Sequence, residues 1–556
     1  MTIFVRLATA ALAVLSSAQL ASAQPAPAPA PPDAGDPPAP APDSPPDATG
    51  QPPARAGSPL DPTAPPPPAS PLATPAPAAT PPGGAAAPSV PNGPEWTSLR
   101  LLHDKGVISD AELASALNDI GVLGAGDATT LVVGKLKTTI YGYVEGNYKY
   151  DSTQTCVEFC GNTQVQRPGT YRGTHGRTLF SARDSRLGIR LAAPVEHGIR
   201  VTGVLETDFF GPTATTEQGT YSNPVLRIRT SFLKLETPVL DILIGQQWSL
   251  FGWQPVFVSA SVQYPGLPGE TFQRTAQLRL SRTIKRDAVT TDVAVAANRP
   301  PQQDSATPEG VAGLRLQLNH WTGQHTAYMA FTTVQPASIA ITGAVRQLRI
   351  PELRATPHSG ITRTGGGVAV GAYLPIIPAT ATSKDNALSL NGELSITSGM
   401  SDDYTALGGA GTANAAIPPA MPGGTVTAYA PNFDAGLAAI DAAGNVELIK
   451  WLAYFASLEF YPAGTGGRLG LVANYGHMES SNARSVGTAS AAASAADRSA
   501  AATRIRDHED VFEVGAFVDP TRATRIAVSG ALYNDVYADG VTARNYASMV
   551  SGWLFF

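Results

Sequence analysis

Apolar and polar side chains alternate along short segments from about residue 135 to the last residue, Phe556. A period of two is typical of β-strands that have one apolar and one polar face. The alternation predicts about sixteen strands, a number within the range of closed membrane barrels. We expect them at residues 136–150, 183–193, 198–210, 225–237, 240–248, 272–281, 285–297, 309–319, 324–333, 362–374, 385–398, 446–461, 466–478, 509–519, 522–533 and 543–556.

The connections between the expected strands alternate between long and short. Long connections are expected at residues 151–182, 211–224, 249–271, 298–308, 334–361, 399–445 and 479–508. Short turns are expected at residues 194–197, 237–239, 282–284, 321–323, 462–465 and 520–521. Long loops at one end and short turns at the other are typical of barrels that close on themselves and leave no strand edge in lipid. We therefore predict an all-β fold, a transmembrane antiparallel β-barrel over residues 135–556.

Arginines recur on the polar face of these strands. In residues 226–232, for example, Arg227 and Arg229 are expected opposite Ile228 and Phe232. A charged residue on the lipid face near the bilayer midplane costs about 2–4 kcal/mol, so the arginine face must point into a polar lumen. By the same alternation, the candidate anion-attracting lumen residues are Arg186, Arg190, Arg200, Arg227, Arg229, Arg279 and Arg315.

Two acidic residues, Glu206 and Asp208, share the polar face of the strand expected at residues 198–210. They lie between the arginines of the neighbouring strands. Two interpretations stay open for this set of charges. It forms an ion-pair network that braces the wall, or it leaves guanidinium groups free to attract anions.

The third long connection, residues 249–271, is unusually apolar for an exposed loop. Folded inward, it would narrow the lumen, with Trp253, Phe257 and Tyr264 as the candidate constriction residues. The alternative is that this apolar loop contacts another subunit. We favour the constriction.

The N-terminal part of the chain has a different composition. Arg6, the apolar run at residues 7–15 and the small residues at 21–23 predict a secretory signal peptide over residues 1–23. Residues 24–94, rich in Pro and Ala, predict a disordered periplasmic linker, either with no partner or as a tether to peptidoglycan. Apolar spacing in residues 95 to about 126 predicts a short helical hairpin, within a helical periplasmic segment expected at residues 95–134 that precedes the barrel.

Bulk composition excludes several classes of protein. After the signal peptide no second long apolar run follows, which argues against a helical membrane protein. A net charge of -6 gives no indication of a nucleic-acid partner. The chain carries none of the common phosphate-loop, zinc-protease or serine-hydrolase motifs, so we expect no enzyme activity, cofactor or metal.

The remaining chemically distinctive residues lie in the expected loops. Cys156 and Cys160 are expected to form a disulfide, and a metal site is the minor alternative. Residues 508–510 (His-Glu-Asp) are expected to solvate a loop or to contact lipopolysaccharide through a divalent ion. Asp402 and Asp403 are expected in a solvated loop, with a cation site as the alternative.

Several segments resemble the DcaP-like trimeric outer-membrane porins. The segment at 141–152 (Tyr-Gly-Tyr-Val-Glu-Gly-Asn-Tyr-Lys-Tyr-Asp-Ser) is similar to the first strand of that family. Segments that match in the family's order follow at residues 183–190, 205–211, 226–229 and 244–249. The resemblance covers roughly residues 138–255 and is only general beyond them. Phosphate-selective barrels are a related alternative.

This resemblance implies a sixteen-stranded, trimeric, passive channel that favours small anionic solutes such as dicarboxylates. It implies lumen roles for Arg186, Arg190, Arg200, Arg227 and Arg229. Separately, a secreted chain whose last strand ends in Phe556 resembles bacterial outer-membrane β-barrels in general, which implies a role for Phe556 in recognition by the barrel-assembly machinery. The expected location is the bacterial outer membrane, in contact with its lipid and lipopolysaccharide. The main rival is a structural or adhesive barrel whose Pro-rich arm contacts the cell wall.

Overall fold

The computed structural model describes most of the chain after residue 129. The described residues are 130–133, 136–156, 158, 164–211, 222–263, 267–302, 305–327, 329, 331–351, 360–404, 437–440, 446–490 and 495–556. The expected signal peptide, Pro-rich linker and helical hairpin lie outside them. At the end of the segment expected to be helical, Thr130–Val133 instead form strand β1 and pair with the beginning of the next strand.

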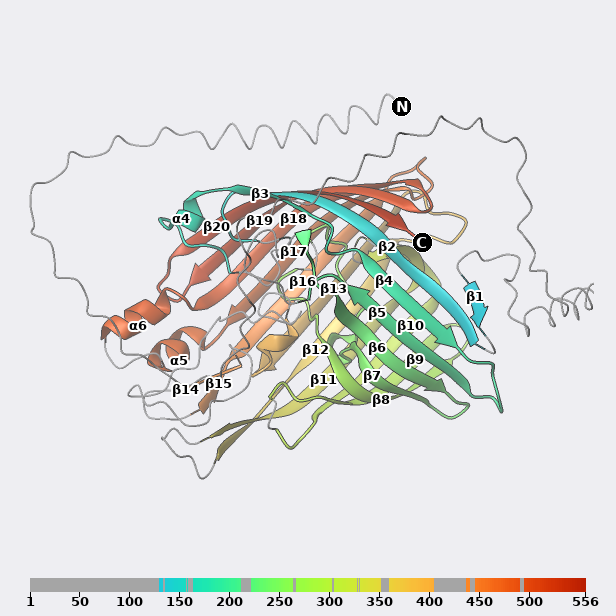
Figure 1. Ribbon diagram of the computed structural model, residues 1–556, viewed down its shortest axis with the longest axis horizontal. Coiled ribbons are helices and arrows are strands. Elements are labelled where there is room, and N and C mark those ends of the chain that lie inside the picture. The colour runs from blue at the N-terminus through green and yellow to red at the C-terminus, as the bar shows by residue number, and fades with distance from the viewer. Residues whose placement is uncertain are drawn as a thin grey trace, which may run out of the picture. The chain divides into compact units, whose positions relative to one another are not determined.

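The main body is one antiparallel sheet that closes on itself (Figure 1). Its strands are β2 (Leu136–Asp151), β3 (Arg177–Ser181), β4 (Arg186–Ala192), β5 (Arg200–Asp208), β6 (Arg227–Glu236), β7 (Asp241–Trp248), β8 (Arg274–Lys285), β9 (Val289–Asn298), β10 (Glu309–Ala327), β11 (Phe331–Pro351), β12 (Gly360–Ile377), β13 (Ala387–Ser398), β16 (Lys450–Tyr461), β17 (Leu469–Ser480), β18 (Arg506–Thr521), β19 (Thr524–Tyr537) and β20 (Thr542–Phe555). Both β3 and β4 pair with β2, so they are two halves of one wall strand. The wall therefore has sixteen strands, and the predicted fold class is confirmed.

The barrel closes where β2 pairs with β20. The terminal residue continues this pairing, because Phe556 N donates to Gly142 O and Gly142 N donates to Phe556 O, each at 3.1 Å. The first and the last wall strands are therefore hydrogen-bonded up to the last residue of the chain.

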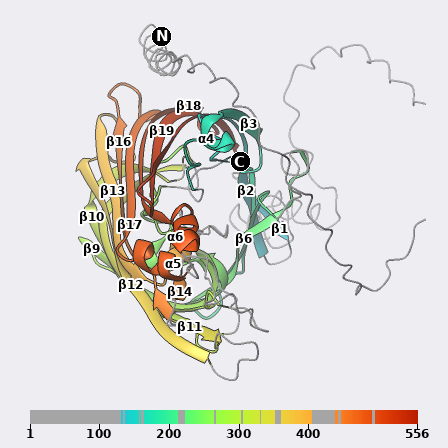
Figure 2. The same cartoon turned by 90° about the vertical axis from the view of Figure 1, so that its left-hand side faces the viewer.

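Smaller elements lie in the long connections. They are α4 (Tyr171–Thr174), η2 (Phe251–Trp253), η3 (Ser401–Asp403), the hairpin of β14 (Ala438–Ile440) and β15 (Val446–Leu448), α5 (Ala483–Ser490) and α6 (Ala495–Ala502). Figure 2 shows the wall strands around a central space, with α5 and α6 at the end that faces the viewer. No helix among the described residues is long and apolar enough to cross a membrane.

The two faces of the wall differ as the alternation predicts. Along β10, the side chains of Leu314, Leu316 and Leu318 are exposed on the outer face, whereas Arg315 and Gln317 face inward and contact Asp292. An apolar outer face and a polar inner face suit a barrel with lipid outside and water inside.

One expected strand was wrong. Residues 324–333 do not form a separate strand, because β10 continues through the expected turn at 321–323 to Ala327 and β11 occupies most of the expected loop at 334–361. A register shift between Leu318 and Thr322 lets the polar and aromatic residues between them stay within the sheet. There, Trp321 Nε1 donates to Pro375 O at 2.7 Å.

A β-bulge in β6 reverses one predicted face. Pairing with β5 jumps from Glu206 with Thr230 to Thr207 with Ile228, so Arg229 is the extra residue. Phe232 pairs with Val204, two residues from Glu206, and it therefore faces the lumen instead of the lipid. The bulge leaves Arg227 and Arg229 on the inner face together.

Candidate functional site

The described residues of the connection between β7 and β8, 249–263 and 267–273, lie inside the barrel against the inner faces of β11–β19. Its backbone contacts inward-facing side chains of four strands, and the side chain of Gln263 contacts a fifth strand. Gly252 N donates to Thr342 Oγ1 of β11, Asn391 Nδ2 of β13 donates to Val258 O, and Ala260 N donates to Ser457 Oγ of β16. Further along, Val262 N donates to Glu513 of β18 and Gln263 Nε2 donates to Ser529 of β19. We call residues 249–273 the lumen loop.

Two wall carboxylates hold the lumen loop by its N–H groups. Glu513 accepts from the N–H groups of Val262 and Gln263, both at 3.1 Å, and from Ser261 Oγ at 2.6 Å. Glu393 of β13 accepts from Thr271 N and Thr271 Oγ1, both at 3.0 Å. All of these groups are buried, so removing either carboxylate would leave buried donors unsatisfied.

A third carboxylate, Glu270, braces the loop internally. It accepts from Ser259 N at 3.1 Å, from Ser259 Oγ at 3.0 Å and from Leu267 N at 3.2 Å. It is fully buried and no cation pairs with it among the described residues. Burial raises the pKa of the Glu270 carboxyl to about 8, because a buried charge without a counter-ion is unfavourable.

Glycines of the wall make room for the aromatic side chains of the lumen loop. A Cβ at Gly371 of β12 would lie 2.5 Å from the Phe257 ring, and a Cβ at Gly313 of β10 would lie 2.5 Å from the Trp253 ring. Phe257 is fully buried and Trp253 is 9% exposed. These two residues line the inside of the barrel, whereas Tyr264 lies outside the described residues. The role of all three as a constriction stays a prediction.

The long connection between β2 and β3 also packs against the inner face of the wall, at β19 and β20. Thr153 Oγ1 donates to Asn545 Oδ1 of β20 at 2.9 Å, and Val165 N donates to Asp535 Oδ2 of β19 at 2.8 Å. Cys156 in this connection is buried and disulfide-bonded, and Cys160, the only other cysteine of the chain, lies outside the described residues. We call the inward faces of β11–β20 the covered wall, because loop residues pack against them.

Three of the candidate arginines are paired with the two carboxylates between them. Arg227 contacts Asp208 through two bonds of 3.0 and 2.7 Å. Arg229, only 1% exposed, contacts Asp208 at 2.7 Å and Glu206 at 3.0 Å, and Arg186 lies 3.7 Å from Glu206. These contacts brace β4, β5 and β6 against one another.

The other candidate arginines have different partners. Arg190 is exposed, with its guanidinium 5.6 Å from the ring centre of Tyr141. Arg200 is 60% exposed and lies 3.8 Å from Glu236. Arg279 donates to Gln277 and to the carbonyl of Trp248. Arg315 pairs with Asp292 at 2.8 Å.

Two lysines on β6 and β8, Lys234 and Lys285, also face the lumen and were not among the residues predicted from the sequence. Lys234 of β6 lies 3.0 Å from both Glu236 and Asp241. Lys285, the last residue of β8, is exposed and pairs in register with the inward-facing Thr290. Alternation along β6 and β8 places both on the inner face. Lys234 lay within the strand expected at residues 225–237, whereas Lys285 lay beyond the strand expected at 272–281, which continues to Lys285. We call the inward faces of β4–β8 the open wall.

The acidic pair at 402–403 is neither solvated nor a cation site. Arg346 of β11 contacts Asp402, Asp403 and Glu309, and all four side chains are at most 2% exposed. The structure thus corrects the expectation of a solvated loop, because the two carboxylates neutralise the buried guanidinium of Arg346. No local sequence pattern reveals this pairing, since Arg346 is more than 50 residues away in the chain.

Residues 508–510 are divided between the two faces of β18. Glu509 faces inward and pairs with Arg506 at 2.5 Å, whereas Asp510 faces outward and contacts His477 and Tyr475, each at 2.7 Å. No group of three or more His, Cys, Asp or Glu side chains within the described part of the chain could hold a metal ion.

Comparison with solved structures finds one similar fold and several weaker matches. The crystal structure of the outer membrane channel DcaP of Acinetobacter baumannii matches with a TM-score of 0.54 and 17% identity, over 76% of this chain and 97% of that one. An anion-selective porin from Comamonas acidovorans matches with a TM-score of 0.41 and 12% identity, over 76% of this chain and all of that one. The first match confirms the resemblance to DcaP at the level of the fold. No protein-family model and no curated protein sequence matches the chain.

Proposed function

We propose that this barrel is a porin of the bacterial outer membrane that lets small hydrophilic solutes, preferentially anions, diffuse through its lumen. The observation that carries the proposal is the contrast inside the barrel. Loops pack against the covered wall, whereas the open wall keeps exposed polar and charged side chains such as Arg190 and Lys285. A closed barrel with a polar, partly exposed inner wall is suited to passive permeation.

The charges of the open wall support the anion preference. With Glu206 and Asp208 engaged by Arg186, Arg227 and Arg229, the remaining inward-facing cations of β4–β8 outnumber the remaining inward-facing carboxylates. The cations are Arg190, Arg200, Lys234, Arg279 and Lys285, and the carboxylates are Glu236 and Asp241. An excess of one sign in a low-dielectric cleft raises the local concentration of the opposite charge, and salt weakens the effect.

Swelling of proteoliposomes tests the proposal. Vesicles that contain the protein are diluted into iso-osmotic succinate, a neutral sugar of similar size, or a diamine. We expect the fastest swelling in succinate and the slowest in the diamine. Equal rates would remove the anion preference and leave a general porin.

A structural or adhesive barrel is the second candidate, because the lumen loop and the first long connection fill part of the interior. A correctly folded barrel that admits none of the three solutes would favour it. Assembly into a homotrimer, contact of the Pro-rich segment with peptidoglycan and recognition of Phe556 by the assembly machinery are further parts of the proposal.

A further inference from the structure

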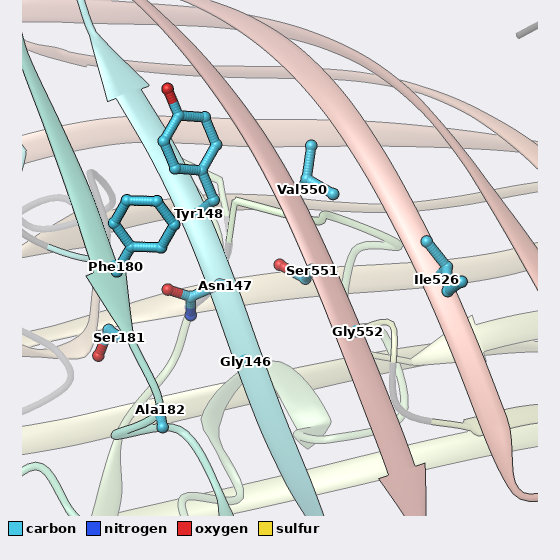
Figure 3. Close-up of a pocket in the computed structure, with 10 residues that line it drawn as sticks. All are labelled: Gly146, Asn147, Tyr148, Phe180, Ser181, Ala182, Ile526, Val550, Ser551 and Gly552. Atoms are coloured by element: carbon cyan, nitrogen blue, oxygen red, sulfur yellow. The ribbon is translucent and has the colours of Figure 1, made fainter.

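A groove of about 600 Å³ lies at the seam where β20 meets β2 and closes the barrel (Figure 3). Gly146 and Gly552 pair directly across the seam, and their missing side chains leave the floor of the groove empty. The outward-facing side chains around these glycines are those of Tyr148, Phe180, Val550 and Ile526. We call this feature the seam groove.

The sides of the seam groove are apolar and open to the surroundings of the barrel. Phe180 and Ile526 lie on the outer face of the wall, and their side chains are 71% and 52% exposed. The rings of Tyr148 and Phe180 lie 4.8 Å apart on one side of the groove. An apolar channel on the lipid-facing surface of a barrel is suited to a hydrocarbon chain.

The outer face of β20 becomes more polar from the groove toward the beginning of the strand, the end at which the long connections lie. Beyond Val550, the outward-facing residues are Ser548, the exposed Tyr546 and then the exposed Arg544. At about 3.3 Å per residue, Arg544 lies roughly 20 Å along the strand from Val550. An exposed tyrosine between an apolar and a charged region is typical of the membrane interface. The order of residues along this strand therefore matches the parts of a lipid. The apolar groove corresponds to the acyl chain, Tyr546 to the membrane interface and Arg544 to the headgroup.

Arg544 has room for an anionic partner. Its Nε donates to Asn534 Oδ1 of β19 at 3.3 Å, and the two residues pair directly across the strands. Among the described residues, no carboxylate forms an ion pair with Arg544. A guanidinium on the outer face of a membrane barrel is best placed beside a lipid phosphate, which it can bind with two parallel hydrogen bonds.

We propose that the seam groove and Arg544 form one binding site for an acylated, phosphorylated lipid of the outer leaflet. An acyl chain occupies the space above Gly146 and Gly552, and the phosphate binds Arg544 beside Asn534. The site requires only that the barrel spans the outer membrane, and it does not depend on transport through the lumen.

Native mass spectrometry of the full-length protein tests the proposal. The protein is refolded with lipid A or with dephosphorylated lipid A, and bound lipid is counted after mild detergent exchange. Gly146→Leu fills the groove, and a Cβ there would meet no heavy atom within 4 Å, so we expect the barrel to fold. The matched control is Gly343→Leu on the outer face of β11, where a Cβ would come no closer than 3.8 Å to its neighbours.

We expect the wild type and Gly343→Leu to retain lipid A and Gly146→Leu to lose it. Arg544→Gln should keep the acyl contacts but lower the preference for the phosphorylated form by about fivefold, the effect of one interfacial cation. Unchanged retention in Gly146→Leu, or an unchanged preference in Arg544→Gln, would overturn the proposal. If Gly146→Leu altered the oligomer mass and not the bound lipid, the groove would instead contact a second copy of the chain. Conductance of the same preparations is a separate readout, so a silent channel with bound lipid would contradict only the proposed function.

Discussion

The covered wall and the open wall share one sequence pattern, yet they present different surfaces to the lumen. Both have apolar residues on the outer face and mostly polar or small residues on the inner face, and several inward-facing residues of the covered wall are aromatic. On the covered wall, Trp451, Phe455 and Tyr461 of β16 face inward and are at most 3% exposed. On the open wall, Thr283 and Lys285 of β8 also face inward and remain exposed. Alternation alone thus identifies the inner face, whereas the loops decide which part of it a solute can reach.

Detaching the lumen loop from the covered wall should have the largest effect, because it would change how much of the lumen is open to solutes. In the double variant Glu393→Ala and Glu513→Ala, the N–H groups of Thr271, Val262 and Gln263 lose their acceptors, at about 1–3 kcal/mol for each buried group left unsatisfied. We expect a clearly larger and noisier single-channel conductance. Asp287→Ala, at a carboxylate that is 97% exposed, is the control. A conductance equal to that of the wild type would mean that the loop does not narrow the path.

Within the open wall, substitution of a buried arginine should lower the stability of the protein more than substitution of an exposed one. Arg229→Met leaves Glu206 and Asp208 short of a partner in a buried site, which typically costs about 3–5 kcal/mol. Arg190→Met, at an exposed arginine, should unfold at nearly the wild-type temperature. Thermal unfolding in detergent, followed by loss of β-structure, measures both. Equal stability of the two variants would refute the bracing role of Arg229.

The smallest expected effect is a pH dependence of the lumen loop. Because the pKa of Glu270 is raised from 4.5 to about 8, its contribution to loop stability is present below pH 4.5 and is lost as the pH rises to about 8. Hydrogen exchange of residues 259–263, corrected for the intrinsic pH dependence, should therefore accelerate over that range and level off above it. Glu270→Gln cannot ionise and should remove the dependence. A wild-type profile that matches the variant would show that another group controls the loop.

The barrel could be predicted from the sequence because alternation is local. Where the prediction failed, the cause was a local irregularity in the sheet. The bulge at Arg229 reverses the face of Phe232, since a shift of one residue moves a side chain to the other side of the sheet. The register shift after Leu318 likewise keeps Trp321 within β10, in a segment whose composition resembles a turn.

The organisation of the lumen could be predicted only in part. The apolar composition of the lumen loop indicated that it would leave the solvent, and it lies inside the barrel. Its attachment points could not be predicted, because Glu393 is 122 residues from Thr271 and Glu513 is 251 residues from Val262. The arginines of the inner face were located by alternation, but only the contacts with Glu206 and Asp208 distinguish the buried Arg186 and Arg229 from the exposed Arg190 and Arg200.

The reversal potential of single channels in a planar bilayer under a salt gradient tests the central claim most directly. The protein is compared with a variant that carries Arg190→Glu, Arg200→Glu and Lys285→Glu on the open wall. The account predicts an anion-biased potential for the wild type, openings in groups of three, and a cation-biased potential for the variant. A wild-type channel without anion bias, or a variant with the same potential as the wild type, would contradict it.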